Sequence, residues 1–383
     1  MSSPRIAAAL ERARSDAASP SSAPPDGRRR TRRVAIGDPQ APFEKFLEIL
    51  DVHGLLGDHG RLREEVQLVG MGDYFDWGVA ADRTRATEGG LRLLAWLAAH
   101  PADQVLLLLG NHDLGRVCEL HGFDEAAFVR AREEADRAYR GGDPDPDLEE
   151  RFLQRFPQLP SAEILARDFS AFHPAQRDLV TLLLKHRRLR IAHAPAKDLL
   201  LCHAGVARDD LELAGVPPNL DAPGLAAALN GLLDERVARW TSGPLDLHPL
   251  HQPGNARERV ARGIFYQRPA KPDTLEPQSD FIGPPRRRFD PRLLPPGLTQ
   301  AIGHIRDAKC RALLAEWVAP EETRDGPLRH LRVRGEEVRY ARGVAGPGSP
   351  DAATLLFLDG GMPHAEARAY ELLDLDTRAP LTK

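Results

Sequence analysis

The chain has 383 residues, of which 42% are hydrophobic and 28% are charged, and its formal net charge is −4. These values indicate a water-soluble globular protein of one large domain or two smaller ones, and they lack the strong basic excess of a dedicated nucleic-acid-binding domain. No apolar run approaches the roughly 20 residues needed to cross a bilayer. The three cysteines lie far apart in the sequence, so we expect reduced thiols and a cytoplasmic location rather than a disulfide framework.

The first segment, residues 1–31, is rich in Ser, Pro and Arg and ends in an arginine cluster. Its few apolar residues cannot offset the entropy lost on ordering, so we expect a disordered tail with at most one fraying helix. It has no apolar core of a secretory signal, and Glu11 and Asp16 argue against a transit peptide. The folded domain is therefore expected over residues 32–383.

Short apolar strands alternate with helical patterns in the next part of the chain. The predicted strands are 33–36, 66–69 and 105–109, and the predicted helices between them are 43–56 and 86–99. This alternation is typical of parallel strands joined by helical crossovers, in a sheet covered by helices on both faces.

The remaining elements are more varied. Residues 114–188 have a charged helical pattern with a turn-rich break at 141–146, which predicts a helical insertion beside the sheet. Strands 189–192 and 199–202 are expected to form a hairpin. The other predictions are helices over 211–240, loops over 241–297, and strands at 299–302, 332–340, 354–358 and 370–375.

Polar residues that can bind metal ions closely follow five of the predicted strands. They are Asp38, Asp73, Asn111 with His112, His203 and His304. In open α/β sheets, ligands bind at the carboxyl ends of the strands, so we expect these side chains to meet. A single Gly-Asp pair after a strand is usually a turn, but five such ends in one chain indicate a metal site. Carboxylate, amide and imidazole ligands together suit two divalent ions such as Mn²⁺, Fe or Zn²⁺.

These residues stand in motifs that resemble those of the calcineurin-like metallophosphoesterases. The motifs are Gly37-Asp38-Pro39-Gln40, Gly72-Asp73-Tyr74-Phe75-Asp76, Gly110-Asn111-His112-Asp113, Cys202-His203-Ala204-Gly205 and Gly303-His304. The segments 240–244 and 262–265 resemble a tryptophan loop and an arginine segment of the phosphoprotein phosphatases and bacterial diadenosine tetraphosphatases, the branch to which the chain is most similar. The resemblance, over residues 33–310, implies a four-layer α/β/β/α sandwich with a helical insertion at about 114–188.

The resemblance also implies a pair of divalent ions and their ligands. Asp38, with Gln40, would bind the first ion, and Asp73 would bridge both. The coordination shell of the second ion would be completed by Asn111, His203 and His304. Mn²⁺ is the expected metal, with Fe, Zn²⁺ or Mg²⁺ as alternatives.

Catalytic roles follow from the same resemblance. A water or hydroxide between the two ions would attack phosphorus in line. His112 would protonate the leaving oxygen while Asp76 orients its ring, and Arg262 would hold phosphate oxygens with its planar guanidinium.

Three departures from the family pattern change these expectations. Gln40 stands where the family has a histidine, and Arg306 stands where many phosphodiesterases have a second metal-binding histidine. We therefore expect an asymmetric pair, in which the first metal site is weaker or is selective for a harder ion such as Mn²⁺ or Mg²⁺. Trp77 replaces a phosphate-binding arginine and is expected to pack rather than to stack on a substrate; Arg306 or Arg116 could substitute for the missing arginine.

The predicted function is metal-dependent hydrolysis of a phosphoester, most simply a monoester on a protein, nucleotide or small molecule. Alternatives are a phosphodiesterase or nuclease, a diadenosine polyphosphate hydrolase, and a metal-binding scaffold that has lost catalysis. The expected partner is a phosphorylated substrate, with no membrane; the bulk charge argues against nucleic acid. No P-loop, Gly-x-Ser-x-Gly or Cys-x-x-Cys motif is present, which disfavours nucleotide motors, serine hydrolases and thiol redox enzymes.

Overall fold

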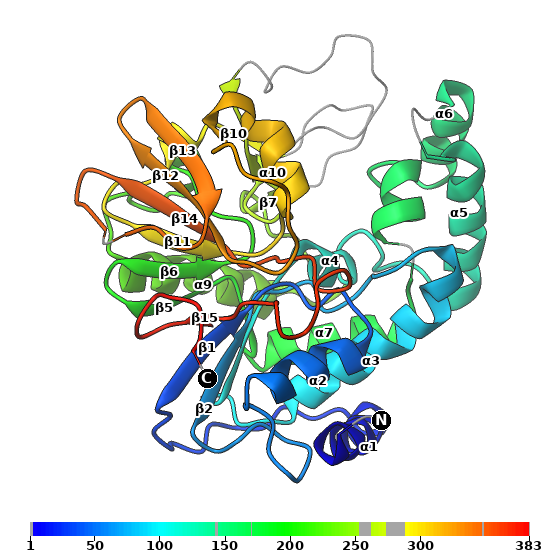
Figure 1. The fold of residues 1–383 in the computed structure, drawn as a ribbon. Coiled ribbons are helices and arrows are strands. Elements are labelled where there is room, and N and C mark those ends of the chain that lie inside the picture. The colour runs from blue at the N-terminus through cyan, green and yellow to red at the C-terminus, as the bar shows by residue number, and fades with distance from the viewer. Residues whose placement is uncertain are drawn as a thin grey trace.

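The computed structural model describes residues 3–141, 145–169, 171–252, 262–272, 288–346 and 348–382, without the side chains of residues 252 and 262. Two β-sheets packed face to face form its centre (Figure 1). The first sheet has the order β15-β1-β2-β3-β4. Its strands are β1 (Arg32–Ile36), β2 (Val66–Gly70), β3 (Val105–Leu108), β4 (Leu189–Arg190) and β15 (Leu373–Asp374).

Strands β1 to β4 are parallel, and β15 joins β1 in the antiparallel direction. In register, Ile36 lies opposite Gly70, and Gly70 lies opposite Leu107. The carboxyl ends of these strands therefore reach the same edge of the sheet, where the metal-binding motifs begin.

The second sheet has the order β13-β12-β14-β11-β6-β5. Its strands are β5 (Ala192–Ala196), β6 (Leu199–Cys202), β11 (Thr299–Ile302), β12 (Arg329–Arg334), β13 (Glu337–Arg342) and β14 (Ala353–Phe357). The central strands β6, β11 and β14 are parallel, so His203 and His304 follow neighbouring strand ends. Two short pairs lie outside both sheets: β7 (His251–Gln252) with β8 (Arg262–Gly263), and β9 (Arg268–Pro269) with β10 (Arg288–Phe289).

Side chains alternate between two cores along each strand, as the pleat requires. Ala35 and Val69 of the first sheet meet Leu201 and Ala301 of the second in the core between the sheets. Their neighbours, such as Ile36, belong to the larger core under the helices. The layers are thus α/β/β/α. The residue pattern alone predicted one sheet with helices on both faces, which is wrong: each sheet has helices on one face and the other sheet on its second face.

The helical layers are assembled from several parts of the chain. Helices α2 (Phe43–Val52), α3 (Arg83–Ala98) and α7 (Pro174–Lys185) cover the first sheet, while α9 (Ala222–Arg239) and α10 (Asp307–Leu314) accompany the second. The short helix α8 (Arg208–Leu213) precedes α9. Between β3 and α7 lie α4 (Asn111–Gly115), α5 (Glu125–Ala138), α6 (Pro146–Arg155) and the single turn η2 (Ile164–Asp168). In Figure 1, α5 and α6 stand beside the sheets, in the region expected to be a helical insertion.

The predicted hairpin of strands 189–192 and 199–202 is wrong in its first strand. Residues 189–190 form β4 at the edge of the first sheet, and Ala192 begins β5 of the second sheet. The chain therefore crosses from one sheet to the other at Ile191, and the hairpin partner of β6 is β5.

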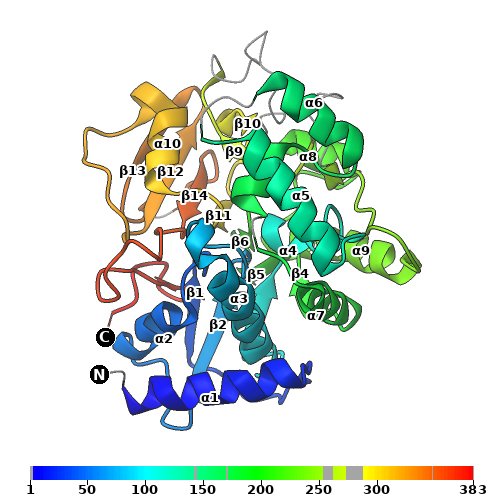
Figure 2. The ribbon, with the colours of Figure 1, turned by 90° about the vertical axis from the view of Figure 1, so that its right-hand side faces the viewer.

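The disordered tail predicted for residues 1–31 is also wrong, because helix α1 (Pro4–Ala18) packs against α2 and α3 (Figure 2). The Ser3 hydroxyl caps its first turn, and Ile6, Ala9 and Ala13 form its buried face. The small alanines let the helix approach so closely that a Cβ on Gly60 would lie 2.4 Å from the backbone of Ala8. None of the helices in the described ranges is both long and apolar enough to cross a membrane.

Candidate active site

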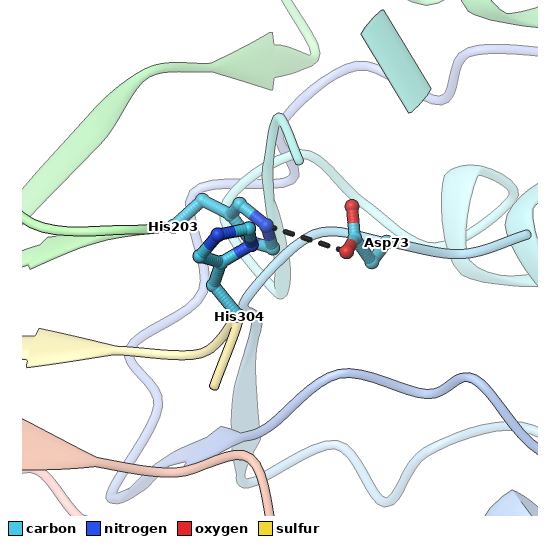
Figure 3. Close-up of side chains that lie close together, drawn as sticks. All are labelled: Asp73, His203 and His304. Atoms are coloured by element: carbon cyan, nitrogen blue, oxygen red, sulfur yellow. Dashed lines mark ion pairs between the residues drawn. The ribbon is translucent and has the colours of Figure 1, made fainter. Parts of the chain in front are cut away.

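The predicted ligands from both sheets meet at one edge of the sandwich. Asp73 follows β2, His203 follows β6 and His304 follows β11, and Figure 3 shows their side chains pointing toward one another. Their ligand atoms all lie within 4.8 Å of one another, and all three side chains are buried. This spacing suits a single ion, because ligand atoms about 2.1 Å from a metal are themselves about 3–4 Å apart.

Glycines and left-handed backbone allow this close approach. Asp73 and His304 have φ values of 60° and 65°, which few residues other than glycine adopt. A Cβ on Gly303 would lie 1.9 Å from Asp38 Oδ1, and one on Gly110 would lie 2.2 Å from Asp73 Oδ1. The glycines that precede His304 and Asn111 are therefore a steric requirement of the site.

The ligands expected for the second ion form one contact group. Asn111 Oδ1 lies 3.0 Å from His203 Nε2, and that nitrogen lies 3.3 Å from Asp73 Oδ2. The other ring nitrogen of His203 is 2.8 Å from the carbonyl oxygen of Met71, which fixes the ring with Nε2 toward the carboxylate. Nε2 of His304 is buried and has no hydrogen-bond partner among the described residues.

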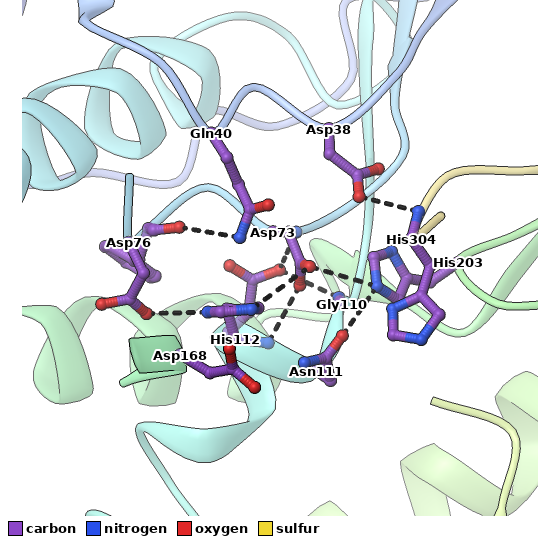
Figure 4. A network of polar contacts seen from close by, with 12 residues as sticks. Asp38, Gln40, Asp73, Asp76, Gly110, Asn111, His112, Asp168, His203 and His304 are labelled. Atoms are coloured by element: carbon purple, nitrogen blue, oxygen red, sulfur yellow. Dashed lines mark hydrogen bonds and ion pairs between the residues drawn. The ribbon is translucent and has the colours of Figure 1, made fainter. Parts of the chain in front are cut away.

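The ligands expected for the first ion are fewer. Asp38 Oδ2 accepts a hydrogen bond of 2.7 Å from the backbone N–H of His304, while its buried Oδ1 has no partner in the described ranges. Gln40 Nε2 donates a 3.4 Å hydrogen bond to the carbonyl of Phe75, and its side chain reaches toward Asp73 (Figure 4).

The buried atoms without partners fit divalent ions, and so do the charges around them. Burial on its own would lower the pKa of His203, but the carboxylates of Asp73 and Asp38 raise it to about 10. Burial, together with the charges of Asp359 and Asp73, raises the pKa of Asp38 well above its usual value, against the effect of His203. Crowded carboxylates that hold a proton on a neighbouring imidazole make a strongly cation-attracting site.

His112 lies beside these ligands and is held by Asp76. Its Nδ1 is 2.9 Å from Asp76 Oδ2, and its Nε2 is 3.9 Å from Asp73 Oδ2 (Figure 4). Burial alone would lower the pKa of His112, but Asp73 and Asp76 raise it to about 9. A histidine that is protonated at neutral pH and directed at the metal-binding edge can donate a proton to a leaving group.

Arg116 and Asp113 support this arrangement. Arg116 is completely buried, and its Nη2 lies 2.7 Å from Asp76 Oδ2. It is therefore committed to Asp76 and does not replace the missing phosphate-binding arginine. Asp113 accepts backbone hydrogen bonds of 2.8–2.9 Å from Asp73, Tyr74 and Gly110, and so fixes the loop that carries Asp73. The position of Asp113 in the Gly-Asn-His-Asp motif is the sequence feature that could indicate this loop-fixing role.

The helical insertion contributes to the site. The ring of Phe169 lies edge-on to His112, with centroids 5.6 Å apart, and the backbone N–H of Ala171 donates to Asp76 Oδ1 at 3.2 Å. Asp168, at the end of η2, lies beside His112 (Figure 4), and its charge helps to raise the pKa of that histidine. Nothing in the spacing of residues 114–188 showed which turn would reach the strand ends.

The remaining predicted residues lie apart from this group or are only partly described. Arg262 is in β8, and its side chain lies outside the described part of the structure. Arg306 points to Asp325, 3.8 Å away, and its side chain is half exposed. Trp77 packs as expected, since Arg85 lies over its ring and its Nε1 faces α3 at Gly89. Asp359 accepts a turn hydrogen bond from the backbone N–H of Gly361, and it is buried and adds negative charge near Asp38.

A comparison with protein families agrees with this geometry. The family model of calcineurin-like phosphoesterases matches residues 31–256, which include β1 to β6 and the motifs from Asp38 to His203. The chain belongs to this family. Calcineurin-like phosphoesterases bind divalent metal ions and hydrolyse phosphoric ester bonds, so the protein is a metal-dependent phosphoester hydrolase. No curated protein shows a significant match to the chain.

Proposed function

We propose that this calcineurin-like phosphoesterase is a phosphomonoesterase with two divalent ions, most simply Mn²⁺, of which the first is bound more weakly. The observation that carries the proposal is the contact of 2.9 Å between His112 and Asp76 beside the metal ligands. A scaffold that only binds metal has no use for an oriented, protonated histidine. A phosphoesterase does use such a histidine, because the departing alkoxide or phenoxide needs a proton.

Each residue of the group has a proposed task. When bound, the ions supply an activated water and neutralise charge on the phosphoryl group. Asp73, with Asn111, His203 and His304, holds one ion, and Asp38 with Gln40 and Asp73 holds the other. His112 keeps its transferable proton on Nε2 because Nδ1 is engaged by Asp76. Arg262 is proposed to hold the phosphate oxygens.

The unequal ion affinities follow from the ligand chemistry. Gln40 is neutral and is a poorer donor than imidazole toward Mn²⁺, Fe or Zn²⁺. Arg306, at the position of the second histidine of many diesterases, carries a positive charge and is turned to Asp325. The first ion therefore has oxygen donors alone, which favours Mn²⁺ or Mg²⁺. The arginine at position 306 also supports a monoester substrate over a diester substrate, because many diesterases have a metal-binding histidine at this position.

The test compares phenyl phosphate with bis(phenyl) phosphate in the presence of Mn²⁺, followed by phosphopeptides, mononucleotides and dinucleoside polyphosphates. We expect the monoester to be hydrolysed at least about tenfold faster, with activity abolished in Asp73→Asn and reduced by about 10²–10⁴ in His112→Asn. Preference for the diester or for a dinucleoside polyphosphate would overturn the monoesterase proposal. Absence of hydrolysis with any divalent ion, in protein shown to carry metal, would overturn the catalytic proposal as well.

A further inference from the structure

A second group of metal-ligating side chains lies buried away from the predicted catalytic residues. Cys118 and Glu119 follow helix α4, and His251 is the first residue of β7. One ligand atom of each lies within 4.8 Å of the others. The three residues are 9%, 2% and 4% exposed, so none of them is a surface group.

The imidazole of His251 is buried without a hydrogen bond to any described residue, although one of its nitrogens lies near a carboxylate. Neither Nδ1 nor Nε2 has a hydrogen-bond partner in the described ranges, and Nε2 lies 3.5 Å from Glu119 Oε1. The ring is held in place, because it stacks on Tyr266 with centroids 5.4 Å apart and an interplanar angle of 15°. A buried polar group with no hydrogen bond is unfavourable, so an additional ligand for this ring is expected.

The surroundings of the other two residues point to the same centre. Glu119 Oε1 accepts a hydrogen bond of 3.0 Å from the Tyr266 hydroxyl, which orients the carboxylate next to the imidazole. Cys118 Sγ lies 3.1 Å from the carbonyl oxygen of Leu245, whose backbone N–H is bonded to Val117. Sulfur, nitrogen and carboxylate oxygen therefore converge, with a carbonyl oxygen beside them.

We propose that Cys118, Glu119 and His251 bind a structural divalent ion of the Zn²⁺ type, separate from the catalytic pair. A thiolate and an imidazole favour Zn²⁺ over Mn²⁺ or Mg²⁺, whereas the first catalytic site offers only oxygen donors. One thiolate and one carboxylate together carry the two negative charges that a divalent ion attracts. The Cys118 thiol releases its proton on binding, which makes the affinity rise with pH.

The position of this ion would let it link two segments of the proposed active site. His251 lies opposite Gly263, and Gln252 lies opposite Arg262, in the β7–β8 pair. Cys118 and Glu119 directly follow α4, which carries Asn111 and His112. The ion would thus tie the strand pair of the proposed phosphate-binding arginine to the helix of the proposed general acid.

The test uses Co²⁺ in place of Zn²⁺, because a cobalt–thiolate bond gives a charge-transfer band in the near ultraviolet that oxygen and nitrogen ligands do not give. We expect this band in the full-length protein and in Asp73→Asn, which disrupts the catalytic site and suits the left-handed backbone at this position. The band should disappear in Cys118→Ser and His251→Gln and persist in Cys310→Ser, a matched buried cysteine outside the group. Total zinc should fall by one equivalent per chain in the first two variants.

Two results would overturn the proposal. One is a folded, metal-loaded protein without the band, which would leave Glu119 and His251 as a buried ion pair. The other is a band that survives Cys118→Ser. Should Cys118→Ser fail to fold, X-ray absorption at the zinc edge of Asp73→Asn decides, since a sulfur neighbour at about 2.3 Å is expected and its absence contradicts the site.

Discussion

The contact between Asp76 and His112 allows a sharp test of the proposed general acid. Asp76→Asn preserves size and suits the φ of 59° at this position, but it removes the charge that holds the proton on His112. The pKa of His112 is raised to about 9 from its ordinary 6.5, by Asp73 and Asp76 against the effect of burial. That net rise corresponds to about 3 kcal/mol. The carboxylates together contribute more than this because burial opposes them, so the loss of one partner removes a substantial part of the rise.

The expected effect depends on the leaving group. Phenoxide needs a proton as it departs, whereas 4-nitrophenoxide departs readily without one. Asp76→Asn should therefore lower kcat for phenyl phosphate by about 10²-fold and kcat for 4-nitrophenyl phosphate by much less. Both rates are measured with saturating Mn²⁺, and Asp178→Asn, an exposed aspartate on α7, serves as the control that leaves both unchanged.

The same substitution should cost stability, because Arg116 is fully buried and its Nη2 lies 2.7 Å from Asp76. Removing one member of a buried ion pair typically costs about 3 kcal/mol, which urea unfolding at neutral pH can measure. Equal losses of kcat for both leaving groups would refute the reasoning, since they would show that Asp76 acts through the fold or the metal rather than through the proton of His112.

Three further predictions concern the metal site and the core. Gln40→His should tighten the first ion by at least about tenfold in calorimetric Mn²⁺ titration, and unchanged affinity would contradict the unequal sites. Gly303→Ala should weaken that ion by about tenfold or more, because its Cβ would lie 1.9 Å from Asp38 Oδ1; Gly346→Ala, with open space around it, should have no effect. His100 is buried and neutral, with Nε2 accepting from the backbone N–H of Leu62 and Nδ1 bonded to the carbonyl of Trp96, and burial lowers its pKa to about 3. Between that value and 6.5 the unfolded chain holds the proton and the folded chain does not, so stability falls by about 1.4 kcal/mol per pH unit as the pH drops. In unfolding experiments from pH 7 to 4, His100→Gln should make the free energy of unfolding depend less steeply on pH. Equal pH dependences in the variant and the unmodified protein would disprove that His100 is buried in its neutral form.

Much of the site was predictable because each ligand follows a short apolar strand in a specific motif. The pattern located Asp38, Asp73, Asn111, His203 and His304, and the structure brings these strand ends to one edge of the sandwich. Parallel strands leave little choice in where their carboxyl ends lie, so local sequence carried this long-range information.

The predictions that were wrong concern contacts between segments that are distant in the sequence. Helix α1 has few large apolar residues, and its alanines become a packing surface only because Gly60 and α3 fit them. The crossing at Ile191 could not be foreseen, because residues 189–192 form one continuous strand-like pattern in the sequence. In the structure, Leu189 and Ala192 pair in different sheets. For the same reason the pattern of the insertion did not reveal that Phe169 and Asp168 would lie beside His112.

Strand β15 has a consequence for how the molecule is made. It pairs with β1 through Ala35 opposite Leu373 and Val34 opposite Asp374, and Arg33 forms an ion pair with Asp376. During synthesis, β1 emerges early, yet this edge of the first sheet stays open until residues 373–376 exist. An unpaired strand edge is a place where nascent chains associate wrongly, so this edge of the first sheet is exposed to mispairing until β15 exists. Asp38, two residues beyond β1, therefore gains its final support only after residues 373–376 have been synthesised.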